Sequence, residues 1–302
     1  MDGIAAREAE APAVDRPRRI GDVVHAALAD SVDRLVRQDA VLRAHADSDS
    51  VHDARVAVRR LRSDLRTFLP VLGAERAREL RERLRRLQDG FSAARDADVL
   101  LARLYRDAED LAELETSAAE ETLAPLRDER DAAYARMREM LDDPSYAALL
   151  RDLADMTEQS SLGGAAEELA CDLVPRIVHD AWSALRKRVR KRSRPPTDQE
   201  LHRIRIAAKR QRYAVEALTP VAGRRARSLA RALENLQTVL GDQHDAVVAR
   251  ERMRALAGDP QRAFVAGALA ALEHRAATDG RGAWRKAWRR AKRAHRALRR
   301  AL

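Results

Sequence analysis

The chain has 302 residues, of which 35% are charged and 3% are aromatic, and its formal net charge is +10. Ala, Leu, Arg and Glu dominate and β-branched runs are scarce, so the composition predicts an all-α fold. The single cysteine, Cys171, excludes a disulfide framework, and no Cys/His spacing is typical of a zinc site. No apolar run approaches the ~18 residues that a membrane-spanning helix needs. We therefore expect a cytoplasmic protein without a transmembrane segment, a metal or another cofactor.

The positive charge is concentrated in the second half of the chain. Residues 165–302 contain 32 Lys and Arg against 14 Asp and Glu, a net charge of +18, so residues 1–164 carry 26 minus 34, or −8. Such an asymmetry favours a large anionic partner, which includes nucleic acid, an anionic membrane surface and polyphosphate.

The apolar periodicity divides the chain into two helical halves. Residues 1–19 lack an apolar core and are expected to form a disordered tail rather than a signal peptide. Residues 20–160 form the first half, residues 161–164 a Gly-containing linker, and residues 165–302 the second half, which ends in a basic helix. Residues 47–50 supply N-cap candidates. The expected helices cover about residues 20–46, 51–69, 74–91, 95 onward, 117–142 and 145–160, then 173–192, a helix ending at 219, 224–240, 242–257, 260–277 and 282–302.

The helix expected over residues 51–69 has one cationic face. At 100° per residue, its basic positions fall within an arc of roughly 80°, and its apolar positions fall on the opposite side. Like charges three and four residues apart repel each other, and a bound polyanion would neutralise them. A solvated charged face is the alternative. The basic positions are His52, Arg55, Arg59, Arg62 and Arg66, and the apolar ones are Val51, Ala54, Val58, Leu61, Leu65 and Phe68.

A partial copy of this helix returns in the second half. His202, Arg205, Lys209 and Arg212 again share one face, and Leu201, Ile204, Ala208, Val215 and Leu218 lie behind them. Residues 51–73 align with 201–223 at an offset of 150, and the residues from Arg76 to Val99 align at an offset of 149. A period this long indicates a duplicated half-domain. We expect two four-helix bundles related by a pseudo-twofold axis, with the two basic faces lining a shared groove or pore.

The residue types of these faces suit a repeating phosphate chain. Arg binds two phosphate oxygens with its planar guanidinium, Lys adds a compact charge, and His can donate a hydrogen bond. We predict as binding residues His52, Arg55, Arg59, Arg60, Arg62, Arg66, Arg78, Arg186, Lys187, Arg190, His202, Arg205, Lys209, Arg210, Arg212 and Arg227.

Other uses of these residues are less favoured. His52 with Asp53, and His244 with Asp245, are the candidate pairs for a metal site. Adjacent helical residues point about 100° apart, so the two side chains of a pair cannot easily bind one ion. Asp96, like Asp245, is expected to cap a helix or to orient an arginine. No phosphate-binding loop, nucleophile elbow or zinc-protease motif occurs, so we expect no catalytic activity.

Residues 282–302 place mainly apolar and aromatic side chains in a narrow stripe along one side of the expected helix, and the stripe ends in Leu302. We expect this stripe to dock on the helical bundle, and a helix lying on a membrane surface is the alternative. The other stripe positions are Trp284, Trp288, Ala291, His295 and Leu298.

These motifs resemble those of the CHAD family, the conserved histidine α-helical domain. Its pattern H-x-x-R-V-A-x-R-R-L-R matches residues 52–62, and H-x-x-R-I-x-x-K-x-x-R-Y-x-x-E matches residues 202–216. R-D-x-D-V occurs at 95–99 and L-Q-x-x-L-G-x-x-x-D at 236–245, so the resemblance covers most of the chain. It implies two four-helix bundles that bind inorganic polyphosphate along a basic groove or pore, and association with polyphosphate granules.

The resemblance does not imply hydrolysis. Some members are fused to a CYTH triphosphatase domain, whose E-x-E-x-K strand motif does not occur here. The chain also has Ser92 where its second half has Gly241. We therefore expect non-catalytic binding of polyphosphate, with a general polyanion-binding or nucleic-acid-binding protein as the alternative. Few aromatic residues accompany the basic faces, which disfavours base stacking with single strands.

Overall fold

The fold is all-α, as predicted. The computed structural model describes residues 19–111, 116–157 and 164–302. Within these ranges it contains nine α-helices and one 3-10 helix, η2 (Gly164–Glu167). None of the described helices combines the length and hydropathy that a membrane span requires. The α-helices are α1 (Ile20–Ala44), α2 (Ser48–Thr67), α3 (Ala74–Glu109), α4 (Thr116–Asp142), α5 (Pro144–Met156), α6 (Ala170–Lys191), α7 (Asp198–Ala217), α8 (Thr219–Leu256) and α9 (Ala263–Arg299).

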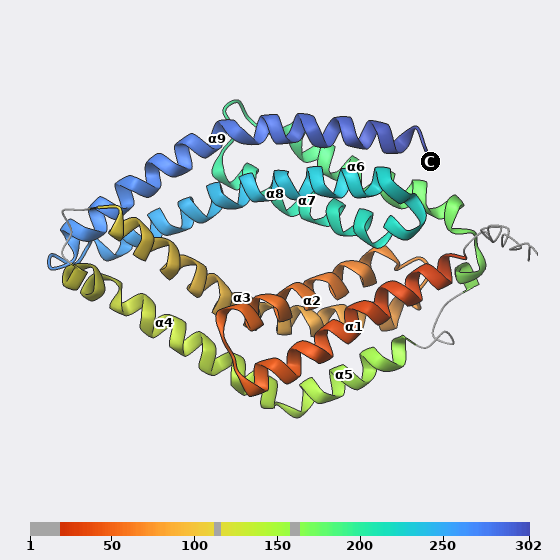
Figure 1. Cartoon of the computed structure of the whole chain (residues 1–302), viewed down its shortest axis with the longest axis horizontal. Coiled ribbons are helices and arrows are strands. Elements are labelled where there is room, and N and C mark those ends of the chain that lie inside the picture. Colours follow the sequence, from red (N-terminus) through yellow and green to blue (C-terminus); the bar gives the residue numbers. More distant parts are fainter. Residues whose placement is uncertain (1–18, 112–115, 158–163) are drawn as a thin grey trace, which may run out of the picture.

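The helices form two layers, α1–α5 and α6–α9 (Figure 1). The two helices with cationic faces, α2 and α7, are the inner helices of their layers and contact each other. The long helices α3, α4, α8 and α9 extend to the other end of the molecule, where their tips converge (Figure 1). A separate apolar cluster joins them there, and it includes Leu104, Leu123, Met253 and Leu269. The layers therefore meet at both ends.

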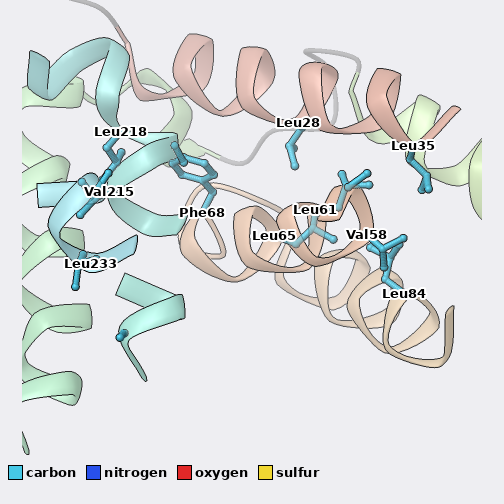
Figure 2. Packing of buried hydrophobic residues seen from close by; sticks show 14 of the residues in the cluster. Leu28, Leu35, Val58, Leu61, Leu65, Phe68, Leu84, Val215, Leu218 and Leu233 are labelled. Carbon is cyan, nitrogen blue, oxygen red and sulfur yellow. The ribbon is translucent and has the colours of Figure 1, made fainter. Parts of the chain in front are cut away.

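The main core lies behind the basic face of α2. Val58, Leu61 and Leu65 of α2 are buried, as the apolar stripe predicted. Figure 2 shows these side chains between α1 and α3. The same apolar cluster continues across the layers through Phe68, which lies near Leu218 of the second layer (Figure 2). Each fully buried side chain of this size contributes about 1.5–3 kcal/mol. The burial on one side leaves the cationic side of α2 facing outward from the core.

Both motif helices begin with the same capping arrangement. The Asp47 side chain accepts a hydrogen bond from the backbone N–H of Ser50 (2.7 Å), and the Ser50 side chain contacts the backbone N–H of Asp47 (3.0 Å). Thr197 and Glu200 form the corresponding capping box at the start of α7. The two caps are separated by the same offset of 150 residues as the basic faces. The N-cap predicted at residues 47–50 is thus confirmed, and both basic faces start at a fixed point.

Three expected helix breaks were wrong. α3 continues through residues 91–95, α8 continues through Gly241, and α9 continues through residues 278–282. Two glycines inside these helices leave room for side chains of neighbouring helices because they lack a Cβ. A Cβ at Gly90 would lie 2.7 Å from Met140 Sδ, and a Cβ at Gly280 would lie 3.1 Å from Gln243 Cβ. Asp96 and Asp245 are consequently inside helices and do not cap them.

Gly223 is the glycine that does end a helical segment. Its φ of 64° lies in the left-handed region, which interrupts the regular geometry near the start of α8. The turn between α7 and the regular part of α8 therefore depends on this glycine.

Residues 1–18 of the tail predicted over 1–19 and residues 161–163 of the linker predicted at 161–164 lie outside the described residues. Arg19 forms an isolated antiparallel β-bridge with Leu169, and Gly164 begins η2. The pseudo-twofold relation between the halves stays a prediction. The docked C-terminal stripe is confirmed, because its side chains are buried or half-buried with the exception of Leu302, which is 43% exposed.

Candidate functional site

Five basic side chains from the two motif helices gather where α2 faces α7. We call this group the central cationic cluster. Its members are all half-buried, which sets them apart from the many exposed arginines of the chain. They are Arg55 and Arg59 of α2 and Arg205, Lys209 and Arg212 of α7.

Lys209 reports the electrostatics of this cluster. Burial, followed by the positive charges of all four arginines, lowers the pKa of its ammonium group to about 7. Burial likewise lowers the pKa of Arg59. Acids at the margins pair with Arg55 and Arg212. Because two facing helices contribute five cations, the unliganded site still holds a net positive charge in a partly desolvated place. An anion bound there would relieve this repulsion.

Side chains at the margins hold the arginines in position. The Arg55 Nε donates a hydrogen bond to Ser92 Oγ (3.0 Å), and its Nη2 contacts Asp96 Oδ1 (3.2 Å). This contact supports the orienting role that was one of the two expectations for Asp96. At the other margin, the Arg212 Nη1 donates to Glu234 Oε1 (2.8 Å). Asp96 and Glu234 thus hold Arg55 and Arg212 in position at the margins of the cluster.

Tyr213 lies between arginines of the two helices. The guanidinium carbon of Arg59 is 5.4 Å from its ring centroid, and that of Arg212 is 5.0 Å away. These are cation–π distances. The ring is buried, with 5% of its surface exposed. Tyr213 therefore serves as a spacer between two guanidinium groups.

The paired histidines lie at the edge of the cluster and are uncharged near neutral pH. Burial, followed by the charges of Arg95 and Arg59, lowers the pKa of His52. Burial also lowers the pKa of His202, whose ring contacts that of His244 with centroids 4.3 Å apart and an interplanar angle of 48°. The Nδ1 atoms of His52 and His202 are buried and have no hydrogen-bond partner among the described residues. Each imidazole is available for one more hydrogen bond.

A second group of arginines continues the basic surface of α2 toward α6. We call it the lateral cationic cluster, and it comprises Arg62, Arg66, Arg81, Arg188 and Arg210. Burial and then the neighbouring cations lower the pKa values of Arg81 and Arg210. The Arg62 Nη1 donates to Gln88 Oε1 (2.8 Å). The earlier turns of α2 thus supply the central cluster through Arg55 and Arg59, and the following turns supply the lateral cluster through Arg62 and Arg66.

Buried donors in both clusters lack protein acceptors. The Nε atoms of Arg59, Arg62 and Arg81 have no hydrogen-bond partner within the described ranges of the chain. An unsatisfied buried donor costs about 1–3 kcal/mol, so such groups call for a specific explanation. A ligand with many acceptor oxygens and several negative charges would satisfy them.

Six predicted site residues lie apart from these two clusters. Arg60 is rotated away from Arg59 and lines a different pocket with Asp22, Asp30 and Glu216. Arg78 is exposed near the start of α3, and Arg227 is exposed on α8 beside Arg224. Arg186, Lys187 and Arg190 lie on α6, where the first and third line a pocket shared with α9. Their binding role stays a prediction.

Four residues near the clusters were absent from the predicted set. Arg81 and Arg188 belong to the lateral cluster, and Tyr213 and His244 border the central one. Arg81 could have been found from its helical spacing with Arg78. His244 aligns with Arg95 rather than with another histidine, so the repeat gave no signal for it.

The chain is similar in sequence to two curated proteins. "Uncharacterized protein Rv2226" and "Uncharacterized protein MT2285", from two strains of Mycobacterium tuberculosis, are each 31% identical over 242 residues. The match covers 78% of this chain and 46% of each relative, so the chain spans about half the length of these curated relatives.

Two solved structures share the fold. The CHAD domain from the plant Ricinus communis superposes with a TM-score of 0.69 at 27% identity, covering 99% of this chain and 98% of that one. PptA from Streptomyces chartreusis has a TM-score of 0.73 at 20% identity, covering 90% of this chain and 99% of that one. The family model described as the CHAD domain matches residues 26–254, and the chain belongs to the CHAD family.

Proposed function

We propose that this protein binds inorganic polyphosphate between α2 and α7 and does not catalyse its hydrolysis. The observation that carries the proposal is the half-buried Lys209 surrounded by four arginines from two helices. A polyphosphate chain bears negative charge and acceptor oxygens on every unit. It can therefore neutralise the central cluster and continue to the lateral cluster along α2.

The aromatic content of the site favours polyphosphate over single-stranded nucleic acid. Nucleic-acid platforms stack bases on accessible aromatic rings. Tyr213 is the aromatic residue of the central cluster, and it is buried beside the guanidinium groups of Arg59 and Arg212. It has no accessible face for a base. The recessed position of Lys209 also disfavours a wide duplex, whose backbone charges would meet exposed residues first.

Family membership supports the same ligand class. The resemblance of the two histidine motifs to CHAD domains implies polyphosphate binding, and the structure brings Arg55, Arg59, Arg205 and Lys209 of those motifs together. Recruitment to polyphosphate granules in the cytoplasm is part of the proposal.

The test compares two variants with the same change in net charge. Arg205→Glu with Lys209→Glu reverses two central cations. Arg254→Glu with Arg275→Glu reverses two exposed arginines on α8 and α9. Binding of labelled long-chain polyphosphate is measured at about 150 mM salt, where exposed charges are strongly screened. We expect the central variant to lose at least about 30-fold in affinity, corresponding to ~2 kcal/mol, and the control to lose little.

Competition with DNA and RNA at equal charge concentration completes the test. Polyphosphate should remain bound, and incubation with Mg²⁺ should release no phosphate. Equal losses in the two charge variants, with helical content intact by circular dichroism, would show that the surface is a general polyanion binder. Displacement by nucleic acid would support the same conclusion.

A further inference from the structure

A second basic pocket lies between α6 and α9, on helices other than the motif helices α2 and α7. We call it the α6/α9 pocket, and its volume is about 580 Å³. This lies in the range of small-molecule sites, about 300–1,000 Å³. Its described lining includes no aspartate or glutamate. Cations from both helices and from the segment after α6 surround it, among them Arg186, Arg190, Arg194, Lys292, Arg296 and Arg299.

Three stacked rings form part of the pocket wall. Trp182 of α6 lies between Trp288 and His295 of α9. The centroids of the two indoles are 5.0 Å apart, and the Trp182 and His295 centroids are 3.9 Å apart, with interplanar angles of 13° and 7°. Trp182 and His295 are each only 6% exposed, whereas Trp288 is half-buried. Trp288 is therefore the ring of this stack that a ligand can reach.

His295 supplies an independent sign of a ligand. It lines the pocket, yet its Nδ1 is buried and has no hydrogen-bond partner in the part of the chain that the structure describes. Burial, followed by the charges of Arg299, His179 and Arg186, lowers the pKa of His295 to about 4. The ring is thus neutral at physiological pH and can form one more hydrogen bond.

The combination of rings and cations differs from that of the central cationic cluster. A chain of phosphates alone would use the arginines and lysine but not an accessible indole. A ligand with an aromatic base and several phosphates uses both, because the base can stack on Trp288 while the phosphates contact the cations.

We propose that the α6/α9 pocket binds a nucleoside polyphosphate, with its phosphates on the basic side chains and its base against Trp288. This site would operate beside the polyphosphate site of the motif helices. Its existence does not depend on the identity of the ligand bound there.

The experiment measures binding of metal-free ATP and of inorganic tripolyphosphate by titration calorimetry at about 150 mM salt. The full chain is used both unchanged and with Arg205→Glu and Lys209→Glu, which remove phosphate-chain binding between α2 and α7 so that the two ligands are compared in the α6/α9 pocket. ATP should bind more tightly. Trp288→Leu should weaken ATP about tenfold and leave tripolyphosphate unchanged, because base stacking on an aromatic ring is worth about that much. Trp288→Phe keeps a ring and should retain most of the ATP affinity. Arg296→Glu with Arg299→Glu should weaken both ligands.

The central variant, Arg205→Glu with Lys209→Glu, separates this proposal from the proposed function. It should leave ATP affinity unchanged although it removes polyphosphate binding. Equal binding of ATP and tripolyphosphate in this central variant would overturn the nucleotide assignment. Loss of ATP binding in the central variant would place the nucleotide between α2 and α7 and overturn the second site.

Discussion

Ligand binding in the central cationic cluster should change the protonation state of Lys209. Its ordinary pKa of 10.5 falls to about 7 in the folded chain, chiefly through burial. Between these values the unfolded chain binds more protons than the folded chain, so this group makes stability rise with pH from about 7 to about 10.5. A bound polyanion favours the charged ammonium and returns the pKa toward its ordinary value. Binding should therefore take up a proton.

The uptake is measured by titration calorimetry at about pH 8.5, in two buffers with different ionisation enthalpies. At this pH the histidines of the site contribute little, because burial lowers the pKa values of His52, His202 and His244 below 6.5. Lys209→Arg keeps the charge but does not titrate in this range, so its proton uptake should disappear while polyphosphate still binds. Undiminished uptake in this variant would show that the ligand does not contact Lys209.

At the scale of elements, the long helices α3 and α8 support corresponding arginines differently. Ser92 of α3 accepts a hydrogen bond from Arg55, whereas Gly241 occupies the aligned position in α8 beside Arg205. A Cβ at Gly241 would lie 3.7 Å from the Arg205 Nε, an ordinary contact distance. Gly241→Ser should therefore fit without displacing its neighbours.

We expect Gly241→Ser to raise the free energy of unfolding by about 0.5–1.5 kcal/mol. About 0.5 kcal/mol comes from helix propensity, and the rest from a hydrogen bond to Arg205. Ser92→Gly should lower the free energy of unfolding by a similar amount. Urea denaturation of both variants provides the comparison. A destabilised Gly241→Ser protein would mean that Arg205 requires the open space beside α8.

The sequence predicted the features that depend on neighbouring residues in the chain but not the contacts between distant helices. The 3.6-residue pattern predicted the buried side of α2, and residues 47–50 predicted its cap, because both depend on neighbours in the chain. The close approach of Met140 of α4 to Gly90 of α3, by contrast, is a contact that no local signal identifies. The approach of α6 to α7, which brings Arg188 to Arg210, has no local signal either. The α6/α9 pocket depends in the same way on the approach of two helices far apart in sequence.

At the scale of the whole molecule, the central cluster requires that the two layers stay in place. The end opposite the α2–α7 contact is closed partly by an ion pair between Arg103 of α3 and Glu273 of α9. The Arg103 Nη2 donates to Glu273 Oε2 (2.7 Å), and its Nε also contacts this carboxylate. Glu273 is 1% exposed. Burial raises the pKa of its carboxyl, and the contact with Arg103 offsets part of that rise.

Removing one partner of this pair should cost more than removing both. Breaking a buried ion pair typically costs 3–5 kcal/mol because the remaining charge is uncompensated. Arg103 is partly exposed, with 21% of its side chain accessible, so we expect Glu273→Gln to lower the free energy of unfolding by about 3 kcal/mol. The double variant Arg103→Met with Glu273→Met should regain most of this loss, as measured by urea denaturation. If the double variant were as unstable as the single one, the charged pair itself would hold the layers together at this end. Apolar packing around Leu104 and Leu269 would then be insufficient to replace it.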